Sequence, residues 1–376
     1  MTKAYIGLDV HKTTISLAVS FGLGEAITYG QCSSDIRRFL RTLRGLLKKY
    51  EMEKKDVRIC YEAGPTGFVL ARHLLRLDFD VIVVAPSLIP VKSGDRVKTD
   101  KRDAKKLARL FRAGELTAVH IPDQADEVIR DLCRARTDAV DAQTRAKQRL
   151  SSFLLRNGHH YTGKSSWTDA HLRYLRELVL NDPIQKLILE EYLQTVDAGI
   201  KRVEGLEDHM RVRLQGWCRR SFTEALQGFR GFQMVAAMVI ASELGDLRRF
   251  DHPRKLMAYL GLVPSEESSG DKRHQGAITK CGNSHVRWML VEVAHHYRMN
   301  PKVSKELTCR QEGLSRPIKA LSWKTQKRLS KRYLKLKMRR LHENKIKVAI
   351  ARELAAFIWE LAHLVEGTPL PHKVTV

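Results

Sequence analysis

The stretch "AYIGLDVHKTTISLAVSF" (residues 4–21) decides the fold of the N-terminal part of the chain. Two apolar segments, residues 4–10 and 14–21, flank a short polar turn, and we predict that they form two consecutive strands. Asp9 lies near the end of the first strand among apolar neighbours, although Asp is disfavoured in strands. An acid at this position either marks an exposed strand end or is held there for a chemical purpose.

The strand pattern continues to about residue 120 and alternates with helices. Ser34 and Thr99 stand where the N-caps of the first and third helices are expected. The order of elements predicts an α/β domain with a mixed sheet. We expect further strands at residues 25–32, 56–62 and 80–86, and helices at residues 35–50, 64–77 and 100–114.

The composition indicates a globular protein with a nucleic-acid partner. The 376 residues suffice for two or three domains, and 43% of them are hydrophobic. Lys and Arg number 67 against 42 Asp and Glu, a formal net charge of +25, and an excess of this size indicates a nucleic-acid ligand. The alternative is a non-specific basic surface of the kind that ribosomal proteins carry.

The six cysteines are scattered and form no CxxC pair, which predicts free thiols in a reducing compartment and no zinc site. The first ten residues lack the apolar run of a secretory signal. No apolar stretch is long enough to cross a bilayer, so we expect a soluble cytoplasmic protein with no membrane partner.

The remaining chain is predicted to be mostly helical. Two long polar segments, residues 126–158 and 193–217, carry apolar residues at helical spacing and predict a long antiparallel coiled coil, a unit that spaces or dimerises domains. We expect four parts: an α/β catalytic domain at 1–120, coiled-coil and nucleic-acid-binding helices at 121–220, a serine-bearing domain at 221–300, and a basic helical extension at 301–376.

Positive charge is concentrated in the last part, because residues 301–350 hold 16 Lys or Arg against 3 Glu. A basic helix is expected at residues 324–347. It is either a solvated face or, as the clustering favours, a surface that contacts phosphates.

Four acids in the first part form a constellation typical of nucleases. Glu62 ends the fourth strand, where ligands gather in sheets of this kind, and Asp100 and Asp103 are three residues apart on one helix, so both can face the same way. Carboxylate oxygens are the ligands of Mg²⁺ or Mn²⁺, and clustered carboxylates repel one another unless a cation or proton offsets them. Two-metal sites clamp the attacking and leaving oxygens of a phosphodiester. We therefore predict that Asp9, Glu62, Asp100 and Asp103 are catalytic metal ligands.

Taken singly, each acid also has a structural explanation. Acids at strand ends can cap turns, and acids in the first turn of a helix are favoured by the macrodipole. The helical pair can also form ion pairs with Arg102, Lys106 or Arg109. Only the combination of all four favours the metal site.

The segment "PSEESSGDKRHQGAITKCGN" (residues 264–283) is expected to be a Gly- and Ser-rich basic loop between two helices. From the residues alone it is either a flexible connector or a place where Ser265, Ser268 or Ser269 acts as a nucleophile beside phosphate-binding cations. The candidate nucleic-acid-binding residues of the whole chain are Lys98, Lys101, Arg102, Lys105, Lys272, Arg273 and Lys280.

Several motifs resemble a known family. "YIGLDVHKTTISLAV" (residues 5–19), "YEAGPTG" (61–67) and "KTDKRDAKKLARL" (98–110) are similar to the DEDD motifs of a bacterial insertion-sequence transposase family, the bridge-RNA-guided recombinases. The N-terminal domain of that family resembles the RuvC Holliday-junction resolvase, which implies an RNase H-like fold here. "LGLVPSEESSG" (260–270) resembles its second, serine-bearing domain, and the resemblance spans most of residues 4–300.

The resemblance implies a DNA recombinase that excises and inserts an insertion sequence by Mg²⁺-dependent cleavage and strand exchange. It implies a serine–DNA covalent intermediate at the "SSG" position, which is Ser269, with Ser268 as the alternative. It also implies a structured guide RNA and a bacterial, nucleoid-associated location. The coiled coil suggests a homodimer or homotetramer in which the serine of one protomer meets the carboxylates of another.

Two other functions stay open. A Holliday-junction resolvase only hydrolyses DNA and needs no nucleophilic serine, and a non-enzymatic nucleic-acid-binding scaffold needs neither the serine nor the acids. The segment "LQGFRGF" (residues 226–232) resembles a helix-hairpin-helix turn, but its Gly-x-x-Gly spacing departs from the usual Gly-x-Gly. This departure argues against binding of a DNA backbone there.

Overall fold

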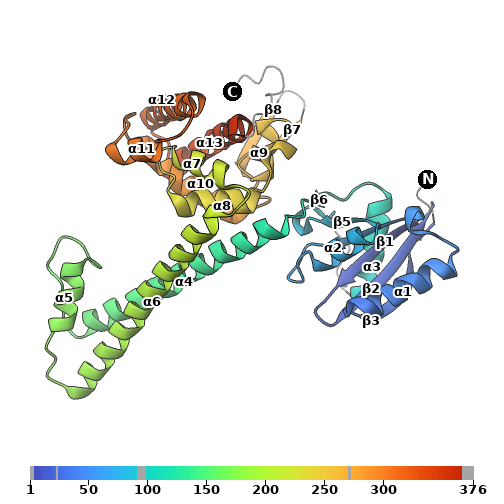
Figure 1. Ribbon diagram of the computed structural model, residues 1–376, viewed down its shortest axis with the longest axis horizontal. Helices are drawn as coiled ribbons and strands as arrows, with labels where there is room; N and C mark the ends of the chain where they lie inside the picture. The colour runs from blue at the N-terminus through green and yellow to red at the C-terminus, as the bar shows by residue number, and fades with distance from the viewer. Residues whose placement is uncertain (1–3, 23, 91–98, 270–271, 366–376) are drawn as a thin grey trace. The chain divides into compact units, whose positions relative to one another are not determined.

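The computed structural model describes residues 4–22, 24–90, 99–269 and 272–365 (Figure 1). Contacts divide the chain into two compact units, Met1–Pro122 and Asp123–Val376. The finer division into four parts stays a prediction.

Unit 1 is built on a mixed six-stranded sheet with the order β3-β2-β1-β4-β5-β6. β1 pairs antiparallel with β2 and parallel with β4, and the mixed sheet predicted from the sequence is thereby confirmed. The short β6 at the edge was not expected. The strands are β1 Ala4–Val10, β2 Thr14–Phe21, β3 Ile27–Ser33, β4 Val57–Glu62, β5 Asp80–Val84 and β6 Ala118–Val119.

Three helices cover the two faces of this sheet. α1 (Ile36–Lys49) and α2 (Val69–Arg76) pack on the face formed by residues such as Ile6 and Leu8. α3 (Asp100–Arg112) packs on the opposite face. Because side chains alternate along a strand, Asp9 points to the α3 face. The sheet, with a helix on either side, is consistent with an RNase H-like domain.

Gly7 allows α3 to lie directly on β1. A Cβ added at Gly7 would overlap the backbone oxygen of Ala104 and the backbone nitrogen of Ala108. Only a residue without a side chain permits this approach of helix backbone to strand backbone. Gly7 therefore sets the distance between the end of β1 and the start of α3.

The helix caps differ in part from the sequence prediction. Asp35 rather than Ser34 caps α1, and its carboxylate accepts a hydrogen bond from the backbone N–H of Arg38 at 2.9 Å. The Ser34 hydroxyl instead donates to the backbone oxygen of Lys12 at 2.7 Å. Thr99 is the N-cap of α3, as expected, but its side chain makes no capping hydrogen bond.

Two helices of equal length, α4 (Gln124–Arg156) and α6 (Pro183–Gln215), begin unit 2. They lie side by side and run antiparallel, with the short α5 (Asp169–Glu177) beyond their far end (Figure 1). Side-chain contacts follow the antiparallel order, since Arg136 bonds Glu207 near one end and Phe153 packs on Tyr192 near the other. The long helical pair is as expected, whereas its supercoiling into a coiled coil stays a prediction.

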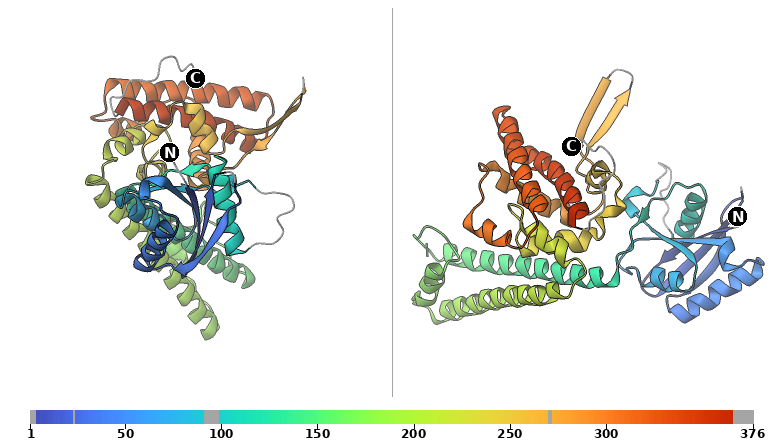
Figure 2. Two further views of the ribbon diagram at one scale, coloured as in Figure 1. Left: turned by 90° about the vertical axis from the view of Figure 1, so that its right-hand side faces the viewer. Right: turned by 45° about the horizontal axis from the view of Figure 1, so that its top comes forward.

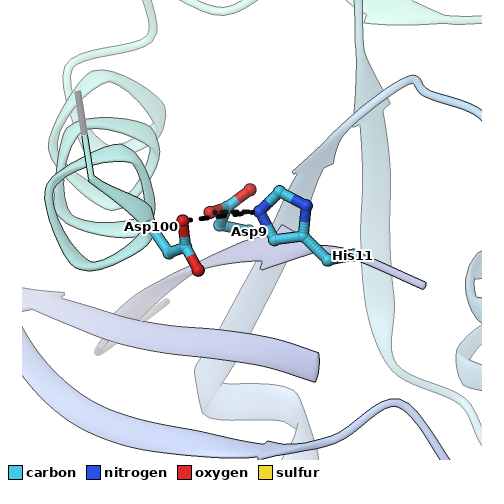
Figure 3. Close-up of side chains that lie close together, drawn as sticks. All are labelled: Asp9, His11 and Asp100. Carbon is cyan, nitrogen blue, oxygen red and sulfur yellow. Dashed lines mark hydrogen bonds and ion pairs between the residues drawn. The ribbon is translucent and has the colours of Figure 1, made fainter. Parts of the chain in front are cut away.

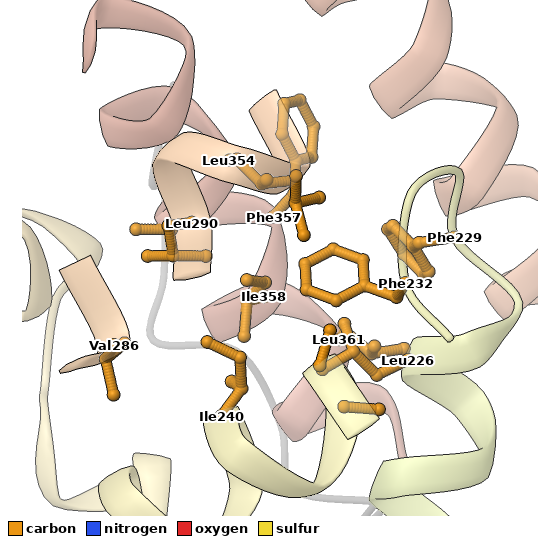
Figure 4. Packing of buried hydrophobic residues seen from close by; sticks show 14 of the residues in the cluster. Leu226, Phe229, Phe232, Ile240, Val286, Leu290, Leu354, Phe357, Ile358 and Leu361 are labelled. Carbon is orange, nitrogen blue, oxygen red and sulfur yellow. The ribbon is translucent and has the colours of Figure 1, made fainter. Parts of the chain in front are cut away.

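The other helices of unit 2 enclose one large apolar core. α13 lies at its centre, because residues 353–359 of this helix are all buried. Figure 4 shows Ile358 and Leu361 of α13 among the side chains of Phe232 and Ile240. The helices are α7 Arg220–Gln227, α8 Met234–Leu244, α9 Pro253–Tyr259, α10 Ser284–Ala294, α11 Lys305–Arg310, α12 Arg316–Met338 and α13 Glu343–Val365.

The basic segment of this unit differs from the sequence prediction. The basic helix expected at residues 324–347 is wrong as a single element, because α12 ends at Met338 and α13 starts at Glu343, with Arg340 at φ 54° between them.

The Gly-containing turn between α7 and α8 is packed inside the unit. Phe229 and Phe232 are fully buried, and the backbone oxygen of Gly228 accepts hydrogen bonds from within the unit. None of the described helices combines the length and apolar character that a membrane crossing requires.

Candidate functional site

Asp9 stands at the carboxyl end of β1, on the face that α3 covers. Leu8 and Tyr61 are register partners of the parallel strands β1 and β4, so Asp9 and Glu62 follow at the neighbouring ends of these two strands. The side chain of Asp9 is only 18% exposed. The sheet therefore places Asp9 at an edge where ligands of open α/β sheets gather.

His11 and Asp100 complete a cluster around Asp9 (Figure 3). The Nε2 atom of His11 lies 3.1 Å from Oδ2 of Asp9 and 3.6 Å from Oδ1 of Asp100. One ligand atom from each residue lies within 4.8 Å of the other two. Asp9 comes from β1, His11 from the turn after it and Asp100 from the first residue of α3, so the contact of α3 with the sheet assembles the cluster.

Burial raises the pKa of Asp9 above its usual value of 3.8. The charge and hydrogen bond of His11 oppose this shift, while the neighbouring carboxylates of Asp100 and Asp103 add to it. The ionised cluster is thus electrostatically unfavourable by itself. A bound cation would relieve this repulsion.

The structure brings together two of the four predicted acids, Asp9 and Asp100. Among the described residues, neither Glu62 nor Asp103 belongs to the group whose ligand atoms all lie within 4.8 Å of one another. Asp103 is half-buried and close enough to affect the pKa of Asp9, and Glu62 is exposed at its strand end. His11 was not predicted, although its place two residues after Asp9 was a signal.

The residues of the cluster fit a hard divalent cation. Carboxylate oxygens of Asp9 and Asp100 are the ligands that Mg²⁺ and Mn²⁺ prefer, whereas the imidazole of His11 is more typical of other metals. Ser16, the cross-strand neighbour of Asp9, has a buried hydroxyl, and no partner for it is found in the described parts of the chain. Such an unpaired buried hydroxyl is expected to gain a hydrogen bond when a hydrated ion or a ligand occupies the site.

Exposed cations lie on the first turns of α3. Lys101, Arg102 and Lys105 are all exposed, whereas Lys98 lies outside the described residues. Their position next to Asp100 is compatible with the predicted contact to a nucleic-acid backbone. The role of these four residues stays a prediction.

The serine segment is a β-hairpin, so the expected loop is wrong. β7 (Pro264–Ser269) pairs antiparallel with β8 (Lys272–Ile278), and the two strands project from the helices of unit 2 (Figure 2). Ser269 is the register partner of Lys272, and Ser268 that of Arg273. The side chains of these four residues lie outside the described part. Lys280 is exposed and follows the hairpin.

The base of the hairpin is fixed to the helical core. Arg287 of α10 donates hydrogen bonds to the backbone oxygens of Leu260 and Cys281, both at 2.9 Å, and so joins the chain before the hairpin to the chain after it. Gly282 adopts φ 67°, and a Cβ there would overlap the backbone oxygen of Tyr259. The two ends of the hairpin are therefore held in close backbone contact.

A buried carboxylate, Glu243 of α8, ties this region to α4. Its side chain is fully buried and accepts hydrogen bonds from Arg134 at 2.8 and 3.1 Å and from Asn283 at 2.7 Å. Arg130 of α4 and His285 of α10 lie 3.4 Å from its oxygens. Asn283 is also the N-cap of α10, so one carboxylate connects α4, α8 and the segment that follows the hairpin.

The pKa of Glu243 reports the strength of this network. Burial alone would raise the pKa, but hydrogen bonds from His285, Arg134 and Asn283 outweigh it and lower the pKa from 4.5 to about 2. Glu243 is consequently ionised at neutral pH. No signal in the sequence distinguished it from the other acids.

Two models of one transposase family match the chain, the first over most of unit 1 and all of α4, the second within unit 2. A family model described as "Transposase" and named DEDD_Tnp_IS110 matches residues 6–158, which include all four predicted acids. A second, described as "Transposase IS116/IS110/IS902 family", matches residues 223–308, which include the hairpin and Glu243. The family resemblance expected from the motifs is thereby confirmed.

Similar proteins support the same assignment. A putative transposase, y4qE, of Sinorhizobium fredii is 42% identical over 96% of this chain and 88% of its own length. The transposase for insertion sequence element IS1533 of Leptospira borgpetersenii is 29% identical over 90% of this chain and 98% of its own. A probable family 20 transposase of Pseudomonas aeruginosa is 25% identical over 81% of this chain and 83% of its own. The chain therefore belongs to the IS110/IS116 family of insertion-sequence transposases.

Proposed function

We propose that this transposase moves its element by means of two chemical centres: the carboxylates of unit 1 and Ser269 of the β7–β8 hairpin. One observation carries the proposal. Asp9 and Asp100, which are far apart in sequence, meet at the carboxyl end of β1, and Nε2 of His11 lies 3.1 Å from the first and 3.6 Å from the second. Clustered acids at the edge of a sheet, in a chain with a net charge of +25, favour chemistry on a nucleic-acid phosphate.

Asp9 and Asp100 would hold the divalent cation, and Glu62 at the end of β4 and Asp103 in the first turn of α3 would complete its ligands. Mg²⁺ or Mn²⁺ bound there would act as a Lewis acid on a phosphodiester oxygen. His11 orients the Asp9 carboxylate through its Nε2 atom and offsets part of the negative charge of the cluster. Lys101, Arg102 and Lys105 would hold the DNA or RNA backbone beside it.

Ser269 would carry the covalent step. Its hydroxyl oxygen attacks the phosphorus of the DNA backbone, the Oγ–P bond forms, and the bond from phosphorus to the 3′ oxygen breaks. The proton of the hydroxyl ends on the released 3′ oxygen. Attack by the 3′ hydroxyl of another strand reverses these changes, so phosphodiester bonds are conserved and no nucleotide cofactor is consumed. The similarity of residues 260–270 to the serine-bearing family domain supports Ser269, with Ser268 as the alternative.

Two further features belong to the proposal. A structured guide RNA would select target and donor DNA, and the large positive charge of the chain is compatible with such a ligand. A homodimer or homotetramer would let the hairpin of one protomer meet the carboxylates of another. A single protomer that suffices for strand exchange would remove this trans arrangement.

The proposal is tested by comparing two kinds of variant in the same DNA-cleavage assay. Asp9→Ala and Asp100→Ala should abolish cleavage, and a chelator should do the same to the unmodified chain. Ser269→Ala should abolish both strand joining and the covalent adduct. Cleavage that persists in Ser269→Ala would indicate a hydrolytic resolvase instead. Nucleic-acid-dependent function that survives every one of these changes would indicate a non-enzymatic scaffold.

A further inference from the structure

An arginine-lined pocket lies on the pair of long helices, away from the acids and the hairpin in sequence. It has a volume of about 250 Å³. α4 contributes most of its lining and α6 contributes one aromatic residue. The lining residues are Arg145, Gln148, Arg149, Ser152, Arg156 and Tyr192.

Three of these residues form a row of positive charge. Arg145, Arg149 and Arg156 recur at intervals of four and seven, which places them on one face of α4. All three are exposed. At about 1.5 Å of rise per residue, the row extends roughly 16 Å along the helix axis.

These arginines differ from others on the same two helices. Arg136 is paired with Glu207 at 2.6 Å. By contrast, across the described parts of the chain no carboxylate lies within ion-pair distance of the guanidinium groups that line the pocket. Guanidinium groups gathered without acids repel one another, so the row lowers its electrostatic energy when an anion occupies it.

Tyr192 adds an aromatic wall that is held in place. It is half-buried, and its ring packs on Phe153 with centroids 5.6 Å apart. An ordered aromatic ring beside arginines offers a stacking surface and a hydroxyl, both of which recur in nucleic-acid sites. Gln148 and Ser152 contribute further neutral hydrogen-bonding groups.

The pocket suits a charged backbone better than a small cofactor. Pockets for small ligands are typically about 300–1,000 Å³ and mostly apolar, whereas this one is smaller and lined by polar groups. Arginine forks match phosphate oxygens with two hydrogen bonds each. Successive phosphates of one duplex strand advance only about 3.4 Å along its axis, so the row can meet several of them.

We propose that this pocket binds the phosphodiester backbone of a nucleic acid, independently of its base sequence. This inference rests on the proposed function, because it requires a chain that binds nucleic acid. It assigns a binding site on α4 and α6 that the proposed catalytic steps do not use. Phosphates of DNA and of RNA have the same chemistry here. Binding of DNA and of RNA, measured separately, distinguishes the two sources.

The test compares a variant with Arg145→Ala, Arg149→Ala and Arg156→Ala to a matched control with Lys201→Ala, Arg202→Ala and Arg213→Ala. The control removes the same charge from exposed positions of α6 outside the pocket. Binding of the full chain to a labelled duplex DNA and to transfer RNA is measured by fluorescence anisotropy at several salt concentrations. Thermal unfolding is followed in parallel.

The pocket variant should lose at least about tenfold in affinity for one of the two nucleic acids, and the slope of log affinity against log salt should fall by about two to three. The control should lose clearly less. The nucleic acid that is affected identifies the source of the phosphates. Equal losses in the two variants, or no loss for either nucleic acid, would overturn the proposal.

Two additions keep the test decisive. If the triple variant unfolds, Arg149→Ala is compared with Arg202→Ala, and the former should reduce the salt slope by about one. Tyr192→Phe keeps the packing on Phe153 and should retain stacking, so it should bind better than Tyr192→Ala.

Cleavage of DNA is assayed separately. Pocket-dependent binding without any cleavage would contradict the proposed function and would still support the pocket as a binding site.

Discussion

His11 places its Nε2 atom 3.1 Å from Oδ2 of Asp9, at the carboxyl end of the central strand β1. The same nitrogen lies 3.6 Å from Asp100, so one imidazole faces two carboxylates that come from different elements. This contact lowers the pKa of Asp9 against the opposing effect of burial. The protonation of the site consequently depends on a residue outside the four acids.

Removing His11 should shift the pH dependence of DNA cleavage. Without its charge and hydrogen bond, Asp9 ionises at a higher pH, and an ionised Asp9 is needed to hold a cation. We expect His11→Ala to move the acidic limb of the cleavage–pH profile to higher pH. His11→Gln, which keeps a hydrogen-bond donor, should move it less, and identical profiles for all three proteins would contradict this role.

Asp9→Asn should stabilise the protein in the absence of divalent ions. The pKa of Asp9 is raised in the folded state, so folding favours the protonated carboxyl over the ionised one. This stabilisation is fully present below pH 3.8 and is lost as pH rises through the folded pKa. At neutral pH its charge therefore costs stability that asparagine does not. We expect a higher Tm for Asp9→Asn in a chelator.

The same variant should lose the response to Mg²⁺. A ligand at a hundred times its Kd stabilises the folded state by about 2.7 kcal/mol, which thermal unfolding detects easily. Glu115→Gln, an exposed acid beyond the other end of α3, is the control and should respond like the unmodified chain. An Asp9→Asn protein that is still stabilised by Mg²⁺ would show that the ion binds elsewhere.

Gly7→Ala should separate α3 from the sheet. The new methyl group would overlap backbone atoms of Ala104 and Ala108, and such overpacking typically costs about 1–3 kcal/mol. Because α3 carries Asp100, DNA cleavage should fall more than stability alone explains. Gly24→Ala is the control, since its added methyl group meets only an ordinary contact at 3.7 Å. Urea unfolding and cleavage by both variants measure the two effects, and unchanged cleavage in Gly7→Ala would contradict this positioning role.

The strands of unit 1 could be predicted because their apolar segments are short and separated by clear turn signals. The acids at two strand ends, Asp9 and Glu62, and the two acids in the first turn of α3 indicated where a site would lie. The sequence did not indicate which acid would meet Asp9. That choice depends on how closely α3 approaches β1, which Gly7 determines in three dimensions.

His11, Ser16 and Glu243 escaped prediction for a common physical reason. Each depends on a feature that only the folded chain has: Asp100 of α3 approaches His11, the Ser16 hydroxyl is buried with no partner in the described parts of the chain, and Glu243 is buried among groups of α4 and α10. A single residue type at one position encodes none of these. The serine hairpin was expected as a loop because Ser, Gly and charged residues are common in loops. β-sheet hydrogen bonding is a backbone property, and it pairs β7 with β8 in spite of this composition.

Glu243→Gln should destabilise the protein in a pH-dependent way. The pKa of Glu243 is lowered from 4.5 to about 2, so its contribution is fully present above pH 4.5 and disappears as pH falls towards about 2. A shift of this size corresponds to about 3 kcal/mol at neutral pH. The difference in unfolding free energy between the two proteins, measured in urea, should therefore be large at pH 7 and shrink below pH 4.5.

The control for this network is Glu224→Gln. Glu224 forms an exposed pair with Arg220 one turn away, and pairs of this kind contribute about 0.3–0.5 kcal/mol. A Glu243→Gln protein no less stable than the control would show that the network does not hold α4 to the base of the hairpin.

The covalent role of Ser269 is tested by trapping the serine–DNA link and mapping the residue that carries it. Protein is incubated with labelled element-end DNA in Mg²⁺, the covalent complex is trapped, and the linked residue is mapped by mass spectrometry of the peptide. We expect a phosphodiester link to Ser269 that is absent in Asp9→Ala. An adduct on any residue other than Ser269 or its neighbour Ser268, or cleaved DNA with no adduct at all, would contradict this role.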